Sequence, residues 1–256
     1  MRVVLLCRQG APARLVANRL HEAGHLDAIV FEGGQAARKR KLARSWGRTP
    51  WWARPRLGVD LLALSLYGRA WRRVLDTRME AAYPTYAYPP DGIPLLGFDD
   101  ANDPACVSAL RDLAPDVLVV YGTSILKEPV LRIADTSLNI HGGIVPAYRN
   151  VHSEVWAVLN GAPGDIGTSI LHLDEGIDSG AVALQRRIEP ATGDFFTLRW
   201  RNLELSAGLI VEALDRHEGG TLPAERQTDD GRVGFYPTPG WRELRRLRNW
   251  HRSRRD

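Results

Sequence analysis

Cysteine is nearly absent from this chain, because only Cys7 and Cys106 occur among its 256 residues. Two thiols make neither a disulfide framework nor the paired spacing of a zinc site. Long apolar runs are missing too: the best candidate, residues 57–68, contains Asp60 and is shorter than the about 20 residues that span a bilayer. The apolar run at residues 3–7 is too short for a signal peptide. We therefore expect a soluble, cytoplasmic protein that has no membrane partner.

Acidic residues are missing from one strongly basic segment. Residues 38–56 contain eight Lys and Arg, three Trp and no acid, and residues 242–256 carry a net charge of +5. The whole chain has a net charge of only +4, so the residues outside these two segments carry −9. A polyanion would be repelled by most of the surface, and a nucleic-acid partner is therefore not expected.

Short apolar runs alternate with segments of helical spacing along the chain. The run at residues 2–6, the helical spacing at 11–24 and the run at 26–31 are typical of the opening of a βαβ unit. The continuous apolar stretch at residues 117–120 is typical of a parallel strand that is covered on both faces. These patterns predict an α/β fold with a doubly wound, mainly parallel sheet.

The remaining pattern predicts the other elements and a division of the chain. Residues 1–190 are expected to form the catalytic domain, with a basic, Trp-rich insertion at about 38–85. Residues 191–256 are expected to form a helical and loop-rich extension, which is also a candidate surface for a homodimer. Further strands are predicted at 93–98, 116–121, 137–141, 167–173 and 180–188, and helices at 57–75, 103–113, 127–134, 151–161 and 195–219.

Three polar side chains form a candidate catalytic group. Asn139 and His141 are two residues apart in a predicted strand, so both point to the same face of the sheet. An amide can hold the oxyanion that forms when a carbonyl is attacked, and an imidazole can move a proton. Asp178 lies where the chain re-enters a strand, and its carboxylate could relay the proton of His141. The alternative, a histidine that only satisfies a strand end, is commoner for a bare Asn-x-His pattern.

The segments around these residues resemble the folate-dependent formyltransferases, which include glycinamide ribonucleotide transformylase, methionyl-tRNA formyltransferase and the sugar N-formyltransferases. The matching segments are residues 137–149 (Ser-Leu-Asn-Ile-His-Gly-Gly-Ile-Val-Pro-Ala-Tyr-Arg), 167–170 and 174–180, and the resemblance covers about residues 91–190. It implies that Asn139, His141 and Asp178 are catalytic, that N10-formyltetrahydrofolate is the formyl donor and that no metal is needed. It places the donor against Tyr121, Gly122, Ile125, Leu126, Asp174, Glu175, Gly176 and Ile177.

Several features depart from the purine and tRNA enzymes of this family. The loop after His141 is Gly142-Gly143-Ile144-Val145-Pro146 instead of Pro-Ser-Leu-Leu-Pro, and His172 is one position away from the histidine of the purine enzymes. The stretch 38–90 is longer than in the purine enzymes, and the part after about residue 190 is shorter than the second domain of the tRNA enzymes. These departures favour another small-molecule amine as acceptor: an amino sugar, possibly nucleotide-linked, or a specialised-metabolite intermediate.

Two other functions remain open at this stage. The same three residues, given water in place of an amine, would make a formyltetrahydrofolate hydrolase. The basic segments 38–56 and 242–256 could instead bind a nucleic acid or a membrane surface, because tryptophans among arginines can stack on bases. Tyr148, Trp156 and Tyr236 could likewise stack on a base or sugar, although each could equally belong to the core.

Overall fold

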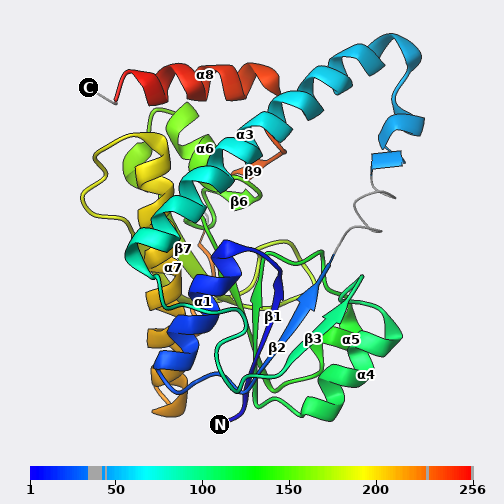
Figure 1. Cartoon of the computed structure of the whole chain (residues 1–256), viewed down its shortest axis with the longest axis vertical. Coiled ribbons are helices and arrows are strands. Elements are labelled where there is room, and N and C mark those ends of the chain that lie inside the picture. The colour runs from blue at the N-terminus through cyan, green and yellow to red at the C-terminus, as the bar shows by residue number, and fades with distance from the viewer. Residues whose placement is uncertain (34–41, 44, 229–230, 255–256) are drawn as a thin grey trace.

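A seven-stranded mixed sheet forms the centre of the computed structural model, which describes residues 1–33, 42–43, 45–228 and 231–254 (Figure 1). The strand order is β3-β2-β1-β4-β5-β7-β8. The first five strands in this order are parallel to one another, and β7 runs antiparallel to both β5 and β8. The predicted α/β fold with a mainly parallel sheet is confirmed. The strands are β1 (Val3–Arg8), β2 (Ala28–Glu32), β3 (Leu95–Phe98), β4 (Val117–Tyr121), β5 (Thr136–His141), β7 (Gly167–His172) and β8 (Val182–Arg187).

Helices cover both faces of this sheet. On one face, α1 (Ala11–Glu22), α7 (Phe195–Glu218) and the C-terminal half of α3 (Arg54–Ala82) share a core with alternate side chains of β1 and β4. On the other face, α4 (Pro104–Leu113) and α5 (Glu128–Leu131) pack on the remaining side chains of the same strands. Strands β1 and β4 are therefore buried on both sides, which explains their continuous apolar sequence.

Helix α7 begins at an N-cap, Asp194, whose side chain accepts a hydrogen bond of 2.9 Å from the backbone N–H of Thr197. Its buried face packs against α1 and against the sheet at β5, β7 and β8. The hydrophobic core thus continues beyond residue 190, where the sequence led us to expect the catalytic domain to end.

Helix α3 is longer than the predicted helix at 57–75, because it runs from Arg54 to Ala82. Its N-terminal part extends away from the rest of the molecule in Figure 1. It follows a single 3-10 turn, η1 (Trp51–Ala53), in which the side chains of Trp51 and Trp52 are 79% and 69% exposed. The basic residues 38–41 and 44, which precede it, lie outside the described part of the chain.

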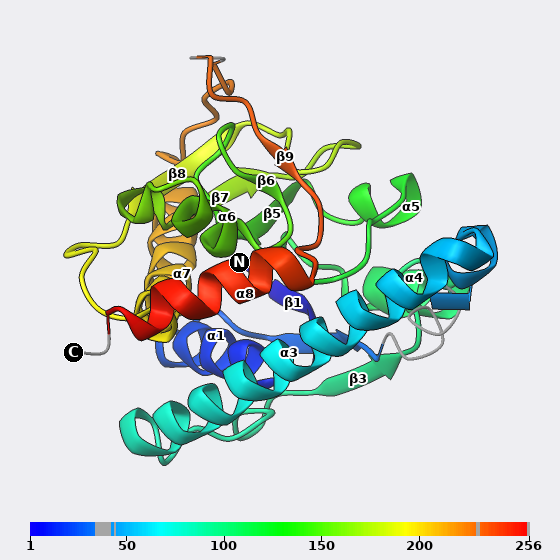
Figure 2. The ribbon, with the colours of Figure 1, turned by 90° about the horizontal axis from the view of Figure 1, so that it is seen from above.

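The basic C-terminal segment forms a helix, α8 (Trp241–Arg252), which packs beside α3 and against α6 (Ser153–Leu159) and α7 (Figure 2). The backbone N–H of Trp241 donates a hydrogen bond of 2.7 Å to Asp60 of α3. Leu244 and Leu247 are buried on the inner side of α8, while its arginines lie outside. Residues 255–256 of the basic segment are not described. The described helices include none with the length and apolar character that crossing a membrane requires.

The predicted helices at 127–134 and 151–161 are both shorter in the structure. Helix α5 is a single turn, and α6 begins only at Ser153 because His152, directly before it, has a left-handed backbone with φ of +60°. Two short strands, β6 (Arg149–Asn150) and β9 (Phe235–Tyr236), form a separate parallel pair, and η2 (Pro163–Asp165) precedes β7.

The order of the strands reverses between β1 and β4. From β1 the chain proceeds to β2 and β3 on one side, whereas β4 is followed by β5 on the other side. Such a switch point leaves a crevice at the carboxyl ends of the two strands, where open α/β sheets bind their ligands. The site is therefore expected beside residues 8–12 and 121–126.

Candidate functional site

Asn139, His141 and Asp178 meet at the carboxyl end of β5. The side-chain N–H of Asn139 donates a hydrogen bond of 3.2 Å to Oδ1 of Asp178. The Nδ1 atom of His141 lies 3.4 Å from the same oxygen. The imidazole and the carboxylate are almost fully buried, with exposed side-chain fractions of 7% and 11%. The structure thus brings together the three side chains that the sequence singled out for catalysis.

The other nitrogen of the His141 ring fixes its tautomer. Nε2 lies 2.7 Å from the backbone carbonyl oxygen of Tyr148, which can only accept a hydrogen bond. Nε2 therefore carries the proton of the neutral ring, and Nδ1 keeps its lone pair. Because Nδ1 faces Asp178, a proton that arrives at Nδ1 would be held beside the carboxylate.

Asp178 is held in place by its backbone as well as by its side chain. Oδ2 accepts a hydrogen bond of 2.8 Å from the N–H of Asn150, and Gln227 donates to the carbonyl oxygens of Asp178 and Gly180, each at 2.8 Å. Asp178 and Asn150 both have left-handed backbones, with φ of +51° and +73°. Such conformations cost free energy in residues other than glycine and persist where the surroundings fix them. Arg149 in turn donates to Oε1 of Gln227 at 2.7 Å.

Gly143 is required by the close approach of two site residues. A Cβ atom at this position would lie 2.6 Å from Nε2 of His141 and 2.5 Å from Oγ of Ser153. Only glycine fits there without movement of the imidazole. The close packing of Gly143 against the imidazole of His141 and the side chain of Ser153 thus explains the second glycine of the Gly142-Gly143 pair.

The loop after β4, predicted to contact the formyl donor, is anchored by Glu32 at the end of β2. The buried Glu32 carboxylate accepts hydrogen bonds from the N–H and the hydroxyl of Ser124, at 2.8 and 2.6 Å, and lies 3.3 Å from Arg8. The sequence analysis missed Glu32. The signal that could have found it is an acid placed directly after the apolar run of a strand, at the carboxyl edge of the sheet.

Other predicted donor residues lie in two loops at the carboxyl edge. Ile125 is 66% exposed and Ile177 is 36% exposed, whereas Leu126 packs in the core beneath α4. The loop after β7 is closed by Asp174, which accepts hydrogen bonds from the N–H of Gly176 and the hydroxyl of Ser179. Exposed apolar side chains on loops that are held this firmly fit the flat ring system of a pterin. Gly122, with φ of +67°, turns the chain after β4, and Glu175 and Gly176 are exposed.

Tyr121 lies on the other face of the sheet from Asn139. In the parallel ladders Tyr121 is paired with Cys7, in the core under α1 and α7, whereas Asn139 is paired with Val120, in the core under α4. The prediction placed Tyr121 in the same donor site as residues near Asn139, whereas in the structure the sheet lies between Tyr121 and Asn139. Burial raises the pKa of the Tyr121 phenol, so it is a neutral hydrogen-bonding group at physiological pH.

A small cavity of about 80 Å³ adjoins Tyr121 on this second face. It lies at the switch point between β1 and β4, and Gly142, the residue after His141, forms part of its wall. The lining residues are Pro12, Trp71, Tyr121, Gly142, Glu154, Arg199, Asn202, Leu203 and Ser206.

The comparison with family models agrees with this arrangement. The model described as formyl transferase matches residues 80–213, a little over half of the chain. The chain belongs to the formyl transferase family. The match extends to Ala213 in α7, which agrees with the position of this helix in the central core.

Relatives of the chain include a curated methionyl-tRNA formyltransferase from Anaeromyxobacter dehalogenans (strain 2CP-1 / ATCC BAA-258), 35% identical over 178 residues. The alignment covers 58% of this chain and 57% of that protein, so the chain spans less than two thirds of the relative. Glycinamide ribonucleotide transformylase 1 from Symbiobacterium toebii has the same fold, with a TM-score of 0.57 at 17% identity over 90% of this chain and 95% of that one. HypX from Aquifex aeolicus, in complex with tetrahydrofolic acid, aligns with a TM-score of 0.56 at 16% identity over 96% of this chain and 31% of that one.

The aromatic residues that were considered for substrate stacking stack on one another in the structure. The ring of Tyr236 is stacked on Tyr148 at 5.5 Å and on Trp156 at 5.1 Å between centroids. Tyr148 is buried, and the indole N–H of Trp156 donates to the carbonyl of Pro237. This stack supports the β6–β9 pair, and through it the backbone of Asn150 that holds Asp178.

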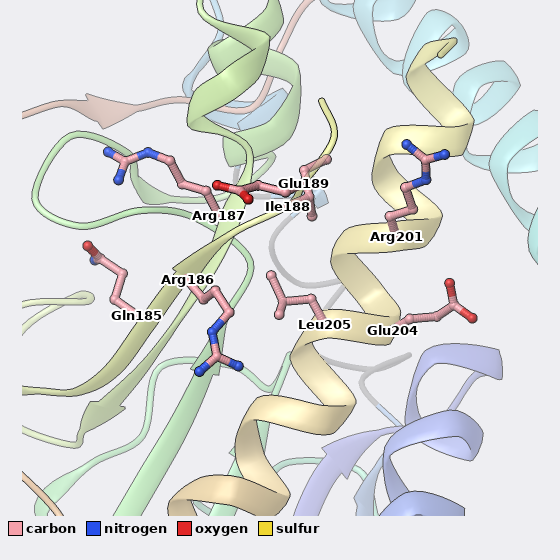
Figure 3. A pocket seen from close by; sticks show the side chains of 8 residues that line it. All are labelled: Gln185, Arg186, Arg187, Ile188, Glu189, Arg201, Glu204 and Leu205. Atoms are coloured by element: carbon pink, nitrogen blue, oxygen red, sulfur yellow. The ribbon is translucent and has the colours of Figure 1, made fainter. Parts of the chain in front are cut away.

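A larger groove, of about 760 Å³, lies between β8 and α7 (Figure 3). Its lining contains none of the predicted site residues. Arg186 and Arg187 are paired with Glu212 and Asp165, and Arg201 donates to two backbone carbonyls. Two of the arginines of the groove are thus ion-paired within the chain, and the third is bound to the backbone.

Proposed function

We propose that this formyltransferase transfers the formyl group of N10-formyltetrahydrofolate to the amine of a small molecule, at Asn139, His141 and Asp178. The observation that carries the proposal is the convergence of an amide N–H and an imidazole Nδ1 on one carboxylate oxygen. The tautomer of His141 leaves Nδ1 ready to take a proton, which is what the attack of an amine on a carbonyl requires.

In the proposed reaction the lone pair of the acceptor amine forms a bond to the formyl carbon, and the formyl oxygen gains negative charge. Asn139 has a second side-chain N–H to offer this oxygen, and a protonated His141 would add a cationic donor. The bond between the carbon and the donor nitrogen then breaks. The amine loses one proton and the donor nitrogen gains one, and His141 and Asp178 carry this proton between them.

Amino sugars, free or nucleotide-linked, are the first acceptors that we propose, followed by other small amines such as intermediates of specialised metabolism. The support for a small acceptor is the small volume beside Gly142 and the departures from the purine and tRNA enzymes in the loop after His141. Because the curated relative bears the name of a tRNA enzyme, methionyl-tRNA is included as a comparison substrate.

The test is formation of tetrahydrofolate from N10-formyltetrahydrofolate by the purified protein, with and without each amine. We expect tetrahydrofolate and a formylated amine in equal amounts with at least one small amine, formed roughly 100- to 10,000-fold more slowly by the Asp178→Asn variant. Release of formate at the same rate with or without any amine would establish the hydrolase alternative instead. Formylation of methionyl-tRNA in preference to every small amine would contradict the proposed acceptor class.

Binding of the donor is tested separately from turnover. A ligand that binds only the folded state raises the stability by RT ln(1 + [L]/Kd). Tetrahydrofolate or 5-formyltetrahydrofolate should therefore raise the melting temperature. The absence of a shift at millimolar concentrations of both compounds would count against a folate site.

A further inference from the structure

Arg199 of α7 lies at the cavity on the second face of the sheet, with its side chain 19% exposed, among side chains of three helices. Its guanidinium carbon lies 4.6 Å from the ring centroid of Trp71 on α3, and one N–H donates a hydrogen bond to the hydroxyl of Tyr67 on the same helix. Glu154 of α6 is the acid nearest to it, with 3.8 Å between Nε of Arg199 and Oε1 of Glu154. The guanidinium is thus fixed in position by aromatic contacts from α3.

The hydrogen-bonding capacity of Arg199 is mostly unused by the described part of the chain. A guanidinium has five N–H groups, and the hydroxyl of Tyr67 takes one of them. Glu154, at 3.8 Å, balances the charge of Arg199 but is too far away for a hydrogen bond. Oε1 of Glu154 instead lies 3.4 Å from the side-chain nitrogen of Asn202. Donors that line a cavity in a fixed plane suit a planar anion that can bind two N–H groups at once.

The cavity is small and adjoins the catalytic residues. Its volume of about 80 Å³ is enough for a small group such as a carboxylate. Gly142 lines the cavity, and His141 directly before it lies within 3.4 Å of Asp178. The cavity is thus connected to the imidazole that faces Asp178 through consecutive residues at the end of β5.

The surrounding charges favour an anion of charge −1. Glu154 already contributes one negative charge near Arg199, and a phosphate dianion would add two more in a buried space. His152, next to the same pair, supplies no compensating charge, because burial lowers its pKa to about 4. A carboxylate therefore fits the cavity better than a phosphate does.

We infer that the acceptor amine carries a carboxylate group, which binds Arg199 in this cavity while the amine reaches Asp178. This inference rests on the proposed function and makes it more specific. Trp71 and Tyr67 come from α3, within the insertion that lengthens this chain relative to the purine enzymes. Arg199 itself lies within residues 80–213, which the family model matches, whereas the two aromatic residues that hold its guanidinium lie outside them.

Matched pairs of acceptors test the inference. Glycine, β-alanine and γ-aminobutyrate are compared with their primary amides, which keep the amine and the shape but lose the negative charge. We expect kcat/KM for at least one of the acids to exceed that of its amide by roughly 100-fold, the range of one charge-assisted bidentate contact. Equal values for acid and amide in all three pairs, together with turnover of either, would overturn the inference while leaving the formyl transfer itself established.

Arg199→Gln assigns the preference to this side chain. It should lower the ratio of kcat/KM for the preferred acid to kcat/KM for its amide to about one. Because removal of one member of a buried ion pair destabilises proteins, Glu154→Gln/Arg199→Gln, which removes both charges, is measured alongside it. The binding of tetrahydrofolate should be the same in all variants. If kcat/KM fell equally for the acid and the amide in the double variant, Arg199 would have only a structural role, and the inference would be contradicted.

A binding measurement decides the case in which no acceptor pair reacts. The N-formyl derivatives of the three acids and of their amides are the products of the proposed reaction, and their binding is measured by calorimetry. Tighter binding of the formylated acid than of its amide, lost in the double variant, would support the carboxylate site even if the transfer is not observed. Equal binding of acid and amide would refute it.

Discussion

The Nδ1 atom of His141 faces Oδ1 of Asp178 at 3.4 Å, while Nε2 of the same ring is bound to a backbone carbonyl. This arrangement gives the two ring nitrogens different tasks. Nε2 orients the ring, and Nδ1 is the atom at which a proton can arrive. Because the carboxylate and the amide of Asn139 share the same side of β5, the proton and the oxyanion of the proposed reaction would be handled within one buried group.

Replacement of Asp178 by asparagine separates shape from charge. Asp178→Asn can still accept the hydrogen bond from the N–H of Asn150, so the loop should keep its position. Its amide can neither take a proton nor stabilise an imidazolium, and turnover should fall by roughly two to four orders of magnitude. Steady-state kinetics at saturating donor measure the loss, and circular dichroism checks the fold.

His172→Ala is the matched control for this experiment. His172 is paired with Leu138 in the ladder between β5 and β7, and its Nε2 lies 2.8 Å from the carbonyl of Pro223, away from Asn139. Turnover should stay within a few-fold of the wild type. An active Asp178→Asn enzyme together with an inactive His172→Ala enzyme would mean that the catalytic assignment is wrong.

Gly143→Ala should disturb the imidazole directly. The added methyl group would lie 2.6 Å from Nε2 of His141, so either the ring or the 142–146 loop has to move. We expect a loss of stability of about 1–3 kcal/mol and a lower kcat. Gly208→Ala in α7 is the control, because a Cβ there meets nothing within 4 Å and alanine favours the helix by about 1 kcal/mol. Urea unfolding should show opposite signs for the two variants, and equal destabilisation would contradict this explanation of Gly143.

Glu32→Ala should weaken the binding of the formyl donor. Its carboxylate holds the N–H and the hydroxyl of Ser124, and hydrogen bonds to a charged group contribute about 1.5–3 kcal/mol each. Without them the loop after β4 loses its fixed position, and KM for the donor should rise roughly tenfold or more, with a smaller change in kcat. The Glu32→Gln variant keeps one acceptor oxygen, so its KM for the donor should lie between the values of the wild type and of Glu32→Ala. A reduced kcat with an unchanged KM would exclude this positioning role.

The stability of the protein should depend on pH through His152. Burial, with Arg199 nearby, lowers the pKa of its imidazole from 6.5 to about 4, and its Nδ1 has no hydrogen-bond partner among the described residues. Between pH 6.5 and 4 the unfolded chain therefore binds a proton that the folded chain does not. The free energy of unfolding should fall as the pH drops through this range, by up to about 3 kcal/mol, and should gain nothing from His152 above pH 6.5.

His152→Asn isolates this effect. Asparagine tolerates the left-handed backbone at this position and does not titrate. Urea unfolding at pH 7 and pH 4.5 should show a smaller loss of stability on acidification in the variant than in the wild type. The same loss in both proteins would show that other groups cause the pH dependence.

The sequence predicted the sheet better than it predicted the helices outside it. The strands β1 and β4 are buried on both faces, so their apolar runs were unambiguous. Helix α3 was predicted too short, because its first turns follow a segment of arginines and tryptophans and bury few side chains of their own. Helix α5 was predicted too long, because the residues after Leu131 continue the apolar pattern while packing against the core of α4 without forming a helix.

The candidate site was predicted where its residues are close in a motif and missed where they are distant. Asn139 and His141 are separated by one residue, and strand geometry alone places them together. Glu32, Gln227 and Arg199 reach the site or the adjoining cavity from remote parts of the chain, through contacts that no local pattern records. The sequence did not show on which face of the sheet Tyr121 lies, because the direction of a side chain at a strand end depends on the register of the strand with its neighbours.

The hydrogen bonds of Gln227 to the backbone around Asp178, and the pairing of β6 with β9, come from residues that are synthesised after every strand of the central sheet. A nascent chain that has emerged from the ribosome only as far as α7 already contains every strand of the central sheet and all three candidate catalytic residues. It still lacks the residues that fasten the aspartate loop. The ability to react would therefore appear only after residues 227–236 have left the exit tunnel, later than the folding of the sheet itself.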